Sequence, residues 1–242
     1  MTITTEIILF FAAALGGALN SVVGGATFVI FPALVFAGVP PISANATSSV
    51  VVWPAALASV FAYRKDLKLD RSLLGALAIA SLAGGALGAW LLLRTPGAAF
   101  AQLVPWLLLF ATLLFSFGGV LSRRFISASR DSHRSVKGLA GVAVAQLAIS
   151  VYGGYFGAGM GILMLAAYAL ANFGNINTMN GIRSLLGLAI NGVAIAWFMI
   201  HGAITWQPAI VMVIGATITG YAGAATRRRA ARAGRRASGC AA

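Results

Sequence analysis

The sequence predicts an all-α fold, a polytopic membrane helical bundle with two inverted repeats and Gly-broken helices. Three observations lead to this prediction. The composition is too apolar for a water-soluble domain, apolar runs about as long as a membrane span separate clusters of basic residues, and the two halves of the chain carry similar Gly-rich blocks in the same order.

The composition places the chain in a membrane. Residues classed as hydrophobic make up 60% of the 242 residues, charged residues make up 9%, and the mean hydropathy is +0.93. Ordinary soluble domains contain roughly 25% charged residues, so a water-soluble fold is excluded. Cys240 is the only cysteine, which excludes an intrachain disulfide and a metal site built from several cysteines.

The basic residues are clustered. The formal net charge is +13, and most charged residues lie at 64–71, 123–137 and 227–236. In a soluble protein such clusters would indicate nucleic-acid binding, because Lys and Arg neutralise phosphates. Here they flank apolar runs, as the positive-inside rule requires, and they meet anionic lipid headgroups. We therefore expect membrane lipids as partners and no nucleic acid.

Seven apolar runs define the expected helices. Single spans are expected at 42–63, 72–93, 98–121, 178–200 and 206–225, each close to the roughly 20 residues that a spanning helix needs. Two further runs, 5–39 and 138–173, are too long for one span and carry a Gly-rich break near the middle. Each of these could be one long bent helix or two short crossings joined at the glycines.

The charge pattern predicts which side of the membrane each loop occupies. The loops at 64–71 and 122–137 and the Arg-rich tail are expected in the cytoplasm, and 201–205 outside. Between the second loop and the tail the chain must cross an even number of times. Because 178–200 and 206–225 already supply two crossings, 138–173 must supply none or two, which favours a hairpin-like or re-entrant segment.

The two halves of the chain share three sequence blocks. Residues 24–30 match 157–163, residues 45–49 match 180–184, and residues 85–88 match 220–223, in the same order. With opposite loop polarity, this pattern is typical of an inverted repeat, in which transport sites lie near the membrane midplane at broken helices. The predicted organisation is a first membrane repeat (1–121), a basic cytoplasmic loop (122–137), a second membrane repeat (138–225) and an Arg-rich cytoplasmic tail (226–242).

These blocks resemble the TauE/SafE sulfite exporter family, also called the toluene sulfonate uptake permease family. The resemblance is carried by the Gly-rich segment 24–32, the lineup 43–49 and the segment 152–161, and it extends from about residue 15 to 223. It implies a transporter of small sulfur-containing or other organic anions in the bacterial cytoplasmic membrane. The last helix of the family pattern is replaced by the Arg-rich tail, which keeps a second hypothesis open, a membrane-embedded accessory or structural subunit that needs a partner chain.

The candidate substrate-binding residues lie at the glycine breaks and in the matching blocks. A break in a membrane helix exposes backbone N–H groups at a helix N-terminus, which binds anions without a basic side chain. The candidates are Asn20, Ser21, Gly24, Gly25, Thr27, Asn45, Thr47 and Ser48 in the first half, and Tyr152, Gly157, Gly159, Gly161, Asn180, Arg183 and Ser184 in the second half. Ser49 is a further donor beside Ser48.

Other glycines are expected to let helices pack closely. On that basis Gly88→Ala should be mild, whereas Gly159→Val should damage transport by blocking the approach of an anion to the backbone. Asn191 is interpreted as interhelical glue rather than as a ligand.

Arg183 is the basic side chain that falls within an expected span. One interpretation is an anion ligand, because intramembrane arginine usually faces the protein interior and its planar fork matches carboxylate or sulfonate oxygens. The other is that the side chain snorkels along its stem to the interface. Both stay open at this point.

The acidic residues and the histidines limit the mechanism. Glu6, Asp66, Asp70 and Asp131 lie near span ends or in loops, so no intramembrane carboxylate is expected as a proton relay. A membrane potential that is negative inside drives an anion outward by about 2.3 kcal/mol per charge per 100 mV. His133 and His201 stand apart, and we expect no cofactor, no metal and no enzyme. The leading hypothesis is an exporter of a small anion such as sulfite, a sulfonate or another organic anion, with a homo-oligomer left open.

Overall fold

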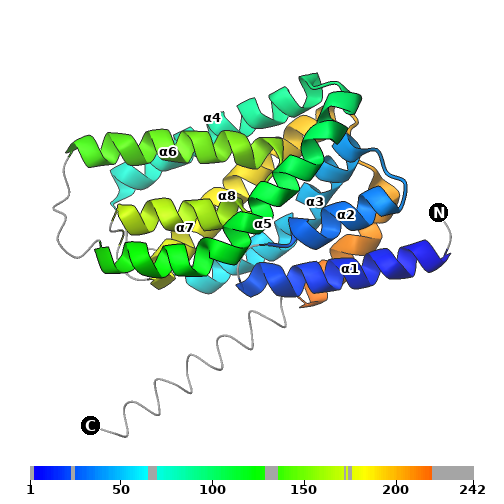
Figure 1. Cartoon of the computed structure of the whole chain (residues 1–242), viewed down its shortest axis with the longest axis horizontal. Coiled ribbons are helices and arrows are strands. Elements are labelled where there is room, and N and C mark those ends of the chain that lie inside the picture. The colour runs from blue at the N-terminus through cyan, green and yellow to red at the C-terminus, as the bar shows by residue number, and fades with distance from the viewer. Residues whose placement is uncertain are drawn as a thin grey trace, which may run out of the picture.

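The computed structural model describes residues 3–22, 25–64, 70–128, 136–171, 173 and 176–219. Over these residues the regular structure is helical: α1 (Ile3–Val22), α2 (Thr27–Phe36), α3 (Pro41–Tyr63), α4 (Arg71–Arg94), α5 (Gly97–Ala128), α6 (Val136–Tyr155), α7 (Met160–Leu170), α8 (Ile176–Ile200) and a further helix, Trp206–Thr219 (Figure 1). Five of the described helices, α1, α3, α4, α5 and α8, are long and apolar enough to cross a membrane. The predicted all-α, polytopic class is confirmed.

The two long apolar runs are helical hairpins. In 138–173 the chain doubles back between α6 and α7, because the Tyr168 hydroxyl donates to Gln146 Oε1 at 2.9 Å while Met160 lies against Gly153. In 5–39 the same follows from the close approach of Gly16 on α1 to Ile30 on α2. The hairpin prediction for the second run is therefore confirmed, and the first run is a hairpin rather than one bent helix.

Glycine geometry explains the second break. Gly157 has φ 76° and Gly159 has φ 77°, a left-handed conformation that residues with a Cβ rarely adopt. Gly159 is also the residue immediately before α7. The helix cannot continue through this pair, so α7 starts with its own N-terminus inside the protein.

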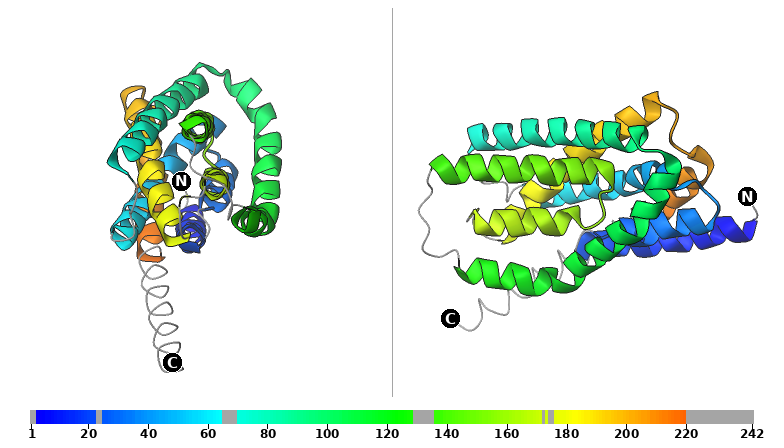
Figure 2. Two further views of the ribbon diagram at one scale, coloured as in Figure 1. Left: turned by 90° about the vertical axis from the view of Figure 1, so that its left-hand side faces the viewer. Right: turned by 45° about the horizontal axis from the view of Figure 1, so that its top comes forward.

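The α1–α2 and α6–α7 hairpins enter the molecule from opposite ends, and their tips meet near its middle (Figures 1 and 2). Helices α3 and α8 pack closely beside both tips. This opposed arrangement agrees with an inverted repeat, which itself stays a prediction.

Helix packing depends on several of the glycines. A Cβ on Gly88 of α4 would collide with the Val151 carbonyl oxygen of α6, and one on Gly84 would lie 2.6 Å from the Cβ of Ser150. Gly17 of α1 lies equally close to the Ala216 carbonyl of the Trp206–Thr219 helix. The expected packing role of these glycines agrees with this geometry, but the expectation that Gly88→Ala is mild does not.

A buried polar network fixes α7 to its neighbours. The side chain of Gln146 on α6 donates to the Ser81 hydroxyl of α4 at 2.8 Å, accepts from the Tyr168 hydroxyl of α7, and lies 3.3 Å from the Ser150 hydroxyl. All four residues are fully buried. Because a buried polar group that loses its partner is costly, this network holds α7 in one position relative to α4 and α6.

Some boundaries differ from the expected ones. Helix α5 continues to Ala128, so residues 122–128 of the expected loop are helical, because this part of the chain extends the preceding span without a helix-breaking residue. The last expected span is described as Trp206–Thr219. The block 220–223, the tail 226–242 and most of the 64–71 loop lie outside the described residues. The four-part organisation and the sidedness of the loops stay predictions.

Candidate functional site

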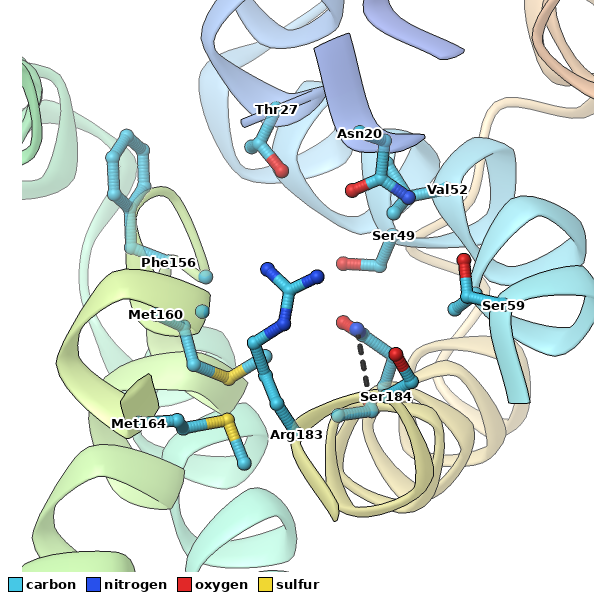
Figure 3. Close-up of a pocket in the computed structure, with 15 residues that line it drawn as sticks. Asn20, Thr27, Ser49, Val52, Ser59, Phe156, Met160, Met164, Arg183 and Ser184 are labelled. Atoms are coloured by element: carbon cyan, nitrogen blue, oxygen red, sulfur yellow. Dashed lines mark hydrogen bonds between the residues drawn. The ribbon is translucent and has the colours of Figure 1, made fainter. Parts of the chain in front are cut away.

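A cavity of about 70 Å³ lies between the tips of the two hairpins. Its lining comes from six elements and consists of Asn20, Thr27, Ser49, Val52, Ala56, Ser59, Phe156, Gly157, Met160, Gly161, Met164, Arg183, Ser184, Gly187 and Asn191 (Figure 3). The volume corresponds to roughly five water molecules. It suits a small ion with part of its hydration shell better than a large organic molecule.

Helices α3 and α8 each contribute one stripe to the lining. On α3 the stripe begins at Ser49 and ends at Ser59, and on α8 it begins at Arg183 and ends at Asn191. Both follow the three-to-four-residue spacing of one helix face. The two stripes supply hydroxyl and amide groups along opposite walls of the cavity.

Arg183 is the charged residue in this lining. Its side chain is 9% exposed, and its guanidinium points into the cavity toward Ser49 and Thr27 (Figure 3). It therefore does not run along the lipid-facing surface, as a snorkelling side chain would. None of the chain's four acidic residues is among the residues that line the cavity.

Gly161 makes room for this arginine. A Cβ built on Gly161 would lie 2.9 Å from Arg183 Nη1 and 3.4 Å from Arg183 Cδ. The missing side chain thus allows the guanidinium to lie against the first turn of α7. This contact is the physical reason for a glycine at the position.

Two helix N-termini meet the same cavity. Thr27 is the first residue of α2 and Met160 is the first residue of α7, and both line the cavity. Each N-terminus carries about half a positive charge from unsatisfied N–H groups. Together with Arg183 they create a positive potential inside an apolar bundle, where a fixed charge is costly unless an opposite charge balances it.

The structure brings six of the predicted site residues together in the cavity lining: Asn20, Thr27, Gly157, Gly161, Arg183 and Ser184. Gly25 lies next to the first tip, where its carbonyl accepts from the Phe28 N–H at 3.2 Å. Gly24 and the side chain of Ser21 lie outside the described residues.

Three predicted residues on α3 are buried but do not line the cavity. Asn45 Nδ2 donates to the Tyr155 carbonyl at 2.9 Å, and the Ser48 hydroxyl donates to the Asn45 carbonyl at 2.8 Å. Thr47 Oγ1 accepts from the Thr205 N–H at 3.0 Å. These contacts join segments of the fold, because the residues face other sides of α3 than Ser49 does.

Three predicted residues in the second half also lie outside the lining. The Tyr152 hydroxyl donates to the Ala158 carbonyl at 2.6 Å and so braces the second tip. Gly159 faces Ala111 of α5, and Asn180 Nδ2 donates to the Ile176 carbonyl at 2.9 Å within its own helix. Their roles as ligands stay predictions without a direct place in this cavity.

Sequence reasoning missed several lining residues. Asn191 donates to the Gly187 carbonyl at 3.1 Å and also lines the cavity, although we interpreted it as interhelical glue. Ser59, Phe156, Met160 and Met164 had no place among the candidates. Steps of three and four residues from Ser49 would have reached Ser59, but nothing in the sequence marks the phenylalanine.

Comparison with known proteins gives the family. Residues 9–241 match the family model described as Sulfite exporter TauE/SafE. The chain is 28% identical over 210 residues to a Sinorhizobium protein named "Probable membrane transporter protein ORF9", covering 86% of this chain and 77% of that protein.

Two more relatives agree with this result. A Haemophilus influenzae protein named "Probable membrane transporter protein" is 25% identical over 218 residues, or 90% of this chain and 83% of that protein. "Probable membrane transporter protein YfcA" of Escherichia coli is 26% identical over 211 residues, or 86% of this chain and 75% of that protein. No solved structure matches. The chain is thus an integral, multi-pass membrane protein that belongs to the TauE/SafE sulfite exporter family of membrane transporters.

Proposed function

We propose that this protein transports small anions across the bacterial cytoplasmic membrane by binding them in the cavity between the two hairpin tips. The observation that carries the proposal is the convergence of Arg183 and the N-termini of α2 and α7 on one cavity whose lining holds no acidic residue. An anion in this place balances the buried positive charge, and it receives hydrogen bonds in the absence of bulk water.

The chemistry of the lining favours an oxyanion. The arginine fork binds two oxygens of a planar or pyramidal group, and hydroxyl donors such as those of Thr27, Ser49 and Ser184 can complete the contacts. The small volume favours sulfite, a short sulfonate or a short carboxylate. Sulfite is the substrate in the printed name of the family.

Export is the direction that we propose. A potential that is negative inside drives an anion outward by about 2.3 kcal/mol per charge per 100 mV, so outward transport needs no coupled proton. The absence of carboxylates from the described cavity lining supports a mechanism without a carboxylate proton relay.

The test is anion efflux from vesicles reconstituted with the purified full chain. Vesicles are loaded with sulfite, methanesulfonate, acetate or chloride, and efflux is followed under an imposed potential for wild type, Arg183→Gln and Arg183→Lys. We expect wild type to release at least one of the oxyanions, Arg183→Gln to lose nearly all of this activity, and Arg183→Lys to be weakened at least about tenfold through loss of a fork hydrogen bond.

The matched control is Arg94→Gln. Arg94 ends α4 and lies over the Trp90 ring at 5.1 Å, outside the cavity lining. Its neutralisation should leave efflux near the wild-type rate. Wild-type efflux by Arg183→Gln, or no efflux of any anion by wild-type protein in sealed vesicles, would reject the proposed function.

A further inference from the structure

The dipeptide Tyr155-Phe156 lies between the cavity and one end of the molecule. Phe156 lines the cavity but is only 2% exposed. Its ring packs edge-on against Phe31 of α2, with centroids 5.3 Å apart, and lies 6.4 Å from the Phe100 ring of α5. The side chain therefore closes the cavity against a layer of aromatic rings.

Tyr155 is held by three other contacts. Its carbonyl accepts from Asn45 Nδ2 of α3 at 2.9 Å, and its hydroxyl lies 3.3 Å from Thr95 Oγ1 at the end of α4. Its ring packs against Phe100 at 5.8 Å. Elements from both halves of the chain thus hold one short segment of the second hairpin tip.

The contacts lie on one side of the cavity along α3. Asn45 is near the start of α3, and the cavity stripe from Ser49 to Ser59 follows it toward Tyr63. At 1.5 Å per residue the stripe is about 15 Å long. The cavity therefore extends toward the Tyr63 end of α3, and Tyr155-Phe156 blocks it toward the Pro41 end.

The closing contact is incompletely satisfied. Asn45 Oδ1 is buried and accepts no hydrogen bond from the described residues. A buried acceptor of this kind often belongs to a segment with more than one arrangement. Gly157, with φ 76°, follows Phe156 directly and can absorb a change in backbone direction.

We propose that Tyr155-Phe156 is the gate that separates the cavity from the Pro41 end of α3, and that its release from Asn45, Phe31 and Phe100 opens the cavity to that side. This inference rests on the proposed function for its purpose, because only a transport site needs access from both sides. The position of Phe156 in the cavity wall lets an occupant of the cavity contact the gate itself.

The experiment measures access rather than transport. In a Cys240→Ser background, Ser49→Cys serves as a probe for a membrane-impermeant thiol reagent, applied to vesicles of each orientation. Ser49→Cys should react from the side of the Tyr63 end and be protected from the other side. Adding Phe156→Ala should raise the protected-side rate by roughly tenfold or more, because both aromatic contacts and the filled volume are lost.

The control is Phe110→Ala, which removes a similar edge-on contact between α5 and the same hairpin. Phe110 packs against Tyr152 at 5.8 Å, outside the gate, and its loss should leave protection unchanged. If Phe156→Ala is not monodisperse in detergent, Phe156→Leu, which retains most of the volume, should raise the rate several-fold. Equal labelling from both sides without a gate substitution, or unchanged protection in a monodisperse Phe156 variant, would overturn the gate. Because labelling needs no transported anion, it separates this result from a failure of the proposed function.

Discussion

At the scale of single residues, the site consists of one charge and the space left for it. Arg183 supplies the charge, and Gly161 supplies the space, because any Cβ there would lie 2.9 Å from the guanidinium. A contact of this length forces the neighbouring group to move. The position of the guanidinium, and with it the geometry of anion binding, depends on the glycine.

We therefore expect Gly161→Ala to raise the KM for the transported anion about tenfold, because a displaced fork loses a charge-assisted hydrogen bond. The measurement is the concentration dependence of efflux in reconstituted vesicles. Gly187→Ala is the control in the same cavity, since its Cβ would meet Met160 Cε at an ordinary 3.7 Å. Equal KM values for the two variants would show that Arg183 does not need this space.

Sequence reasoning reached part of this site. Arg183 was identifiable because a cation within an apolar run is rare, and the glycine breaks marked both tips. Asn45, Thr47 and Ser48 were placed in the site as a block, although only Ser49 beside them lines the cavity. Small and polar residues occur on several faces of α3, so its rotation is decided by the neighbouring helices rather than by its own pattern.

At the scale of helices, glycine contacts determine how closely α4 and α6 pack. A Cβ on Gly88 would collide with the Val151 carbonyl and lie 2.7 Å from the Tyr155 N–H nitrogen, both of which are backbone atoms that cannot rotate away. The same contact lies next to the gate segment. A change at Gly88 should therefore affect stability first and the gate second.

Gly88→Ala is expected to destabilise the protein by about 1–3 kcal/mol through overpacking. Thermal unfolding in detergent, followed by intrinsic tryptophan fluorescence, measures this effect. Gly75→Ala on the same helix is the control, because nothing lies within 4 Å of its Cβ position. It should be neutral or stabilising by up to about 1 kcal/mol from helix propensity. An unfolding temperature for Gly88→Ala that equals that of Gly75→Ala would contradict the close packing of α4 on α6.

The hairpins were partly predictable at this scale. Counting crossings between basic loops required 138–173 to contribute none or two, and the structure has the hairpin α6–α7. The first run carried no such constraint, since no charged loop precedes it. Its form is decided by packing, with Gly16 of α1 against Ile30 of α2.

At the scale of the whole molecule, the sidedness of the loops follows from charge alone and gives a direct prediction. In the Cys240→Ser background, His201→Cys and Gly97→Cys should both react with an impermeant reagent from outside the cell, because both lie in turns at the same end of the bundle. Asp70→Cys, at the start of α4, should react only after the membrane is opened. Labelling of Asp70→Cys in intact cells, or protection of His201→Cys, would reverse or disprove the assigned orientation.

The central claim is that an anion binds between the two hairpin tips on Arg183. Selenite is a heavier analogue of sulfite, and its selenium can be located by anomalous diffraction in crystals of the full chain. After selenite has been shown to compete with efflux of the transported anion, crystals grown at a saturating concentration give the test. The account predicts a selenium peak in the cavity, within hydrogen-bond reach of the Arg183 guanidinium and beside the first turns of α2 and α7. A peak elsewhere in the bundle, or an empty cavity at a concentration that blocks efflux, would contradict it.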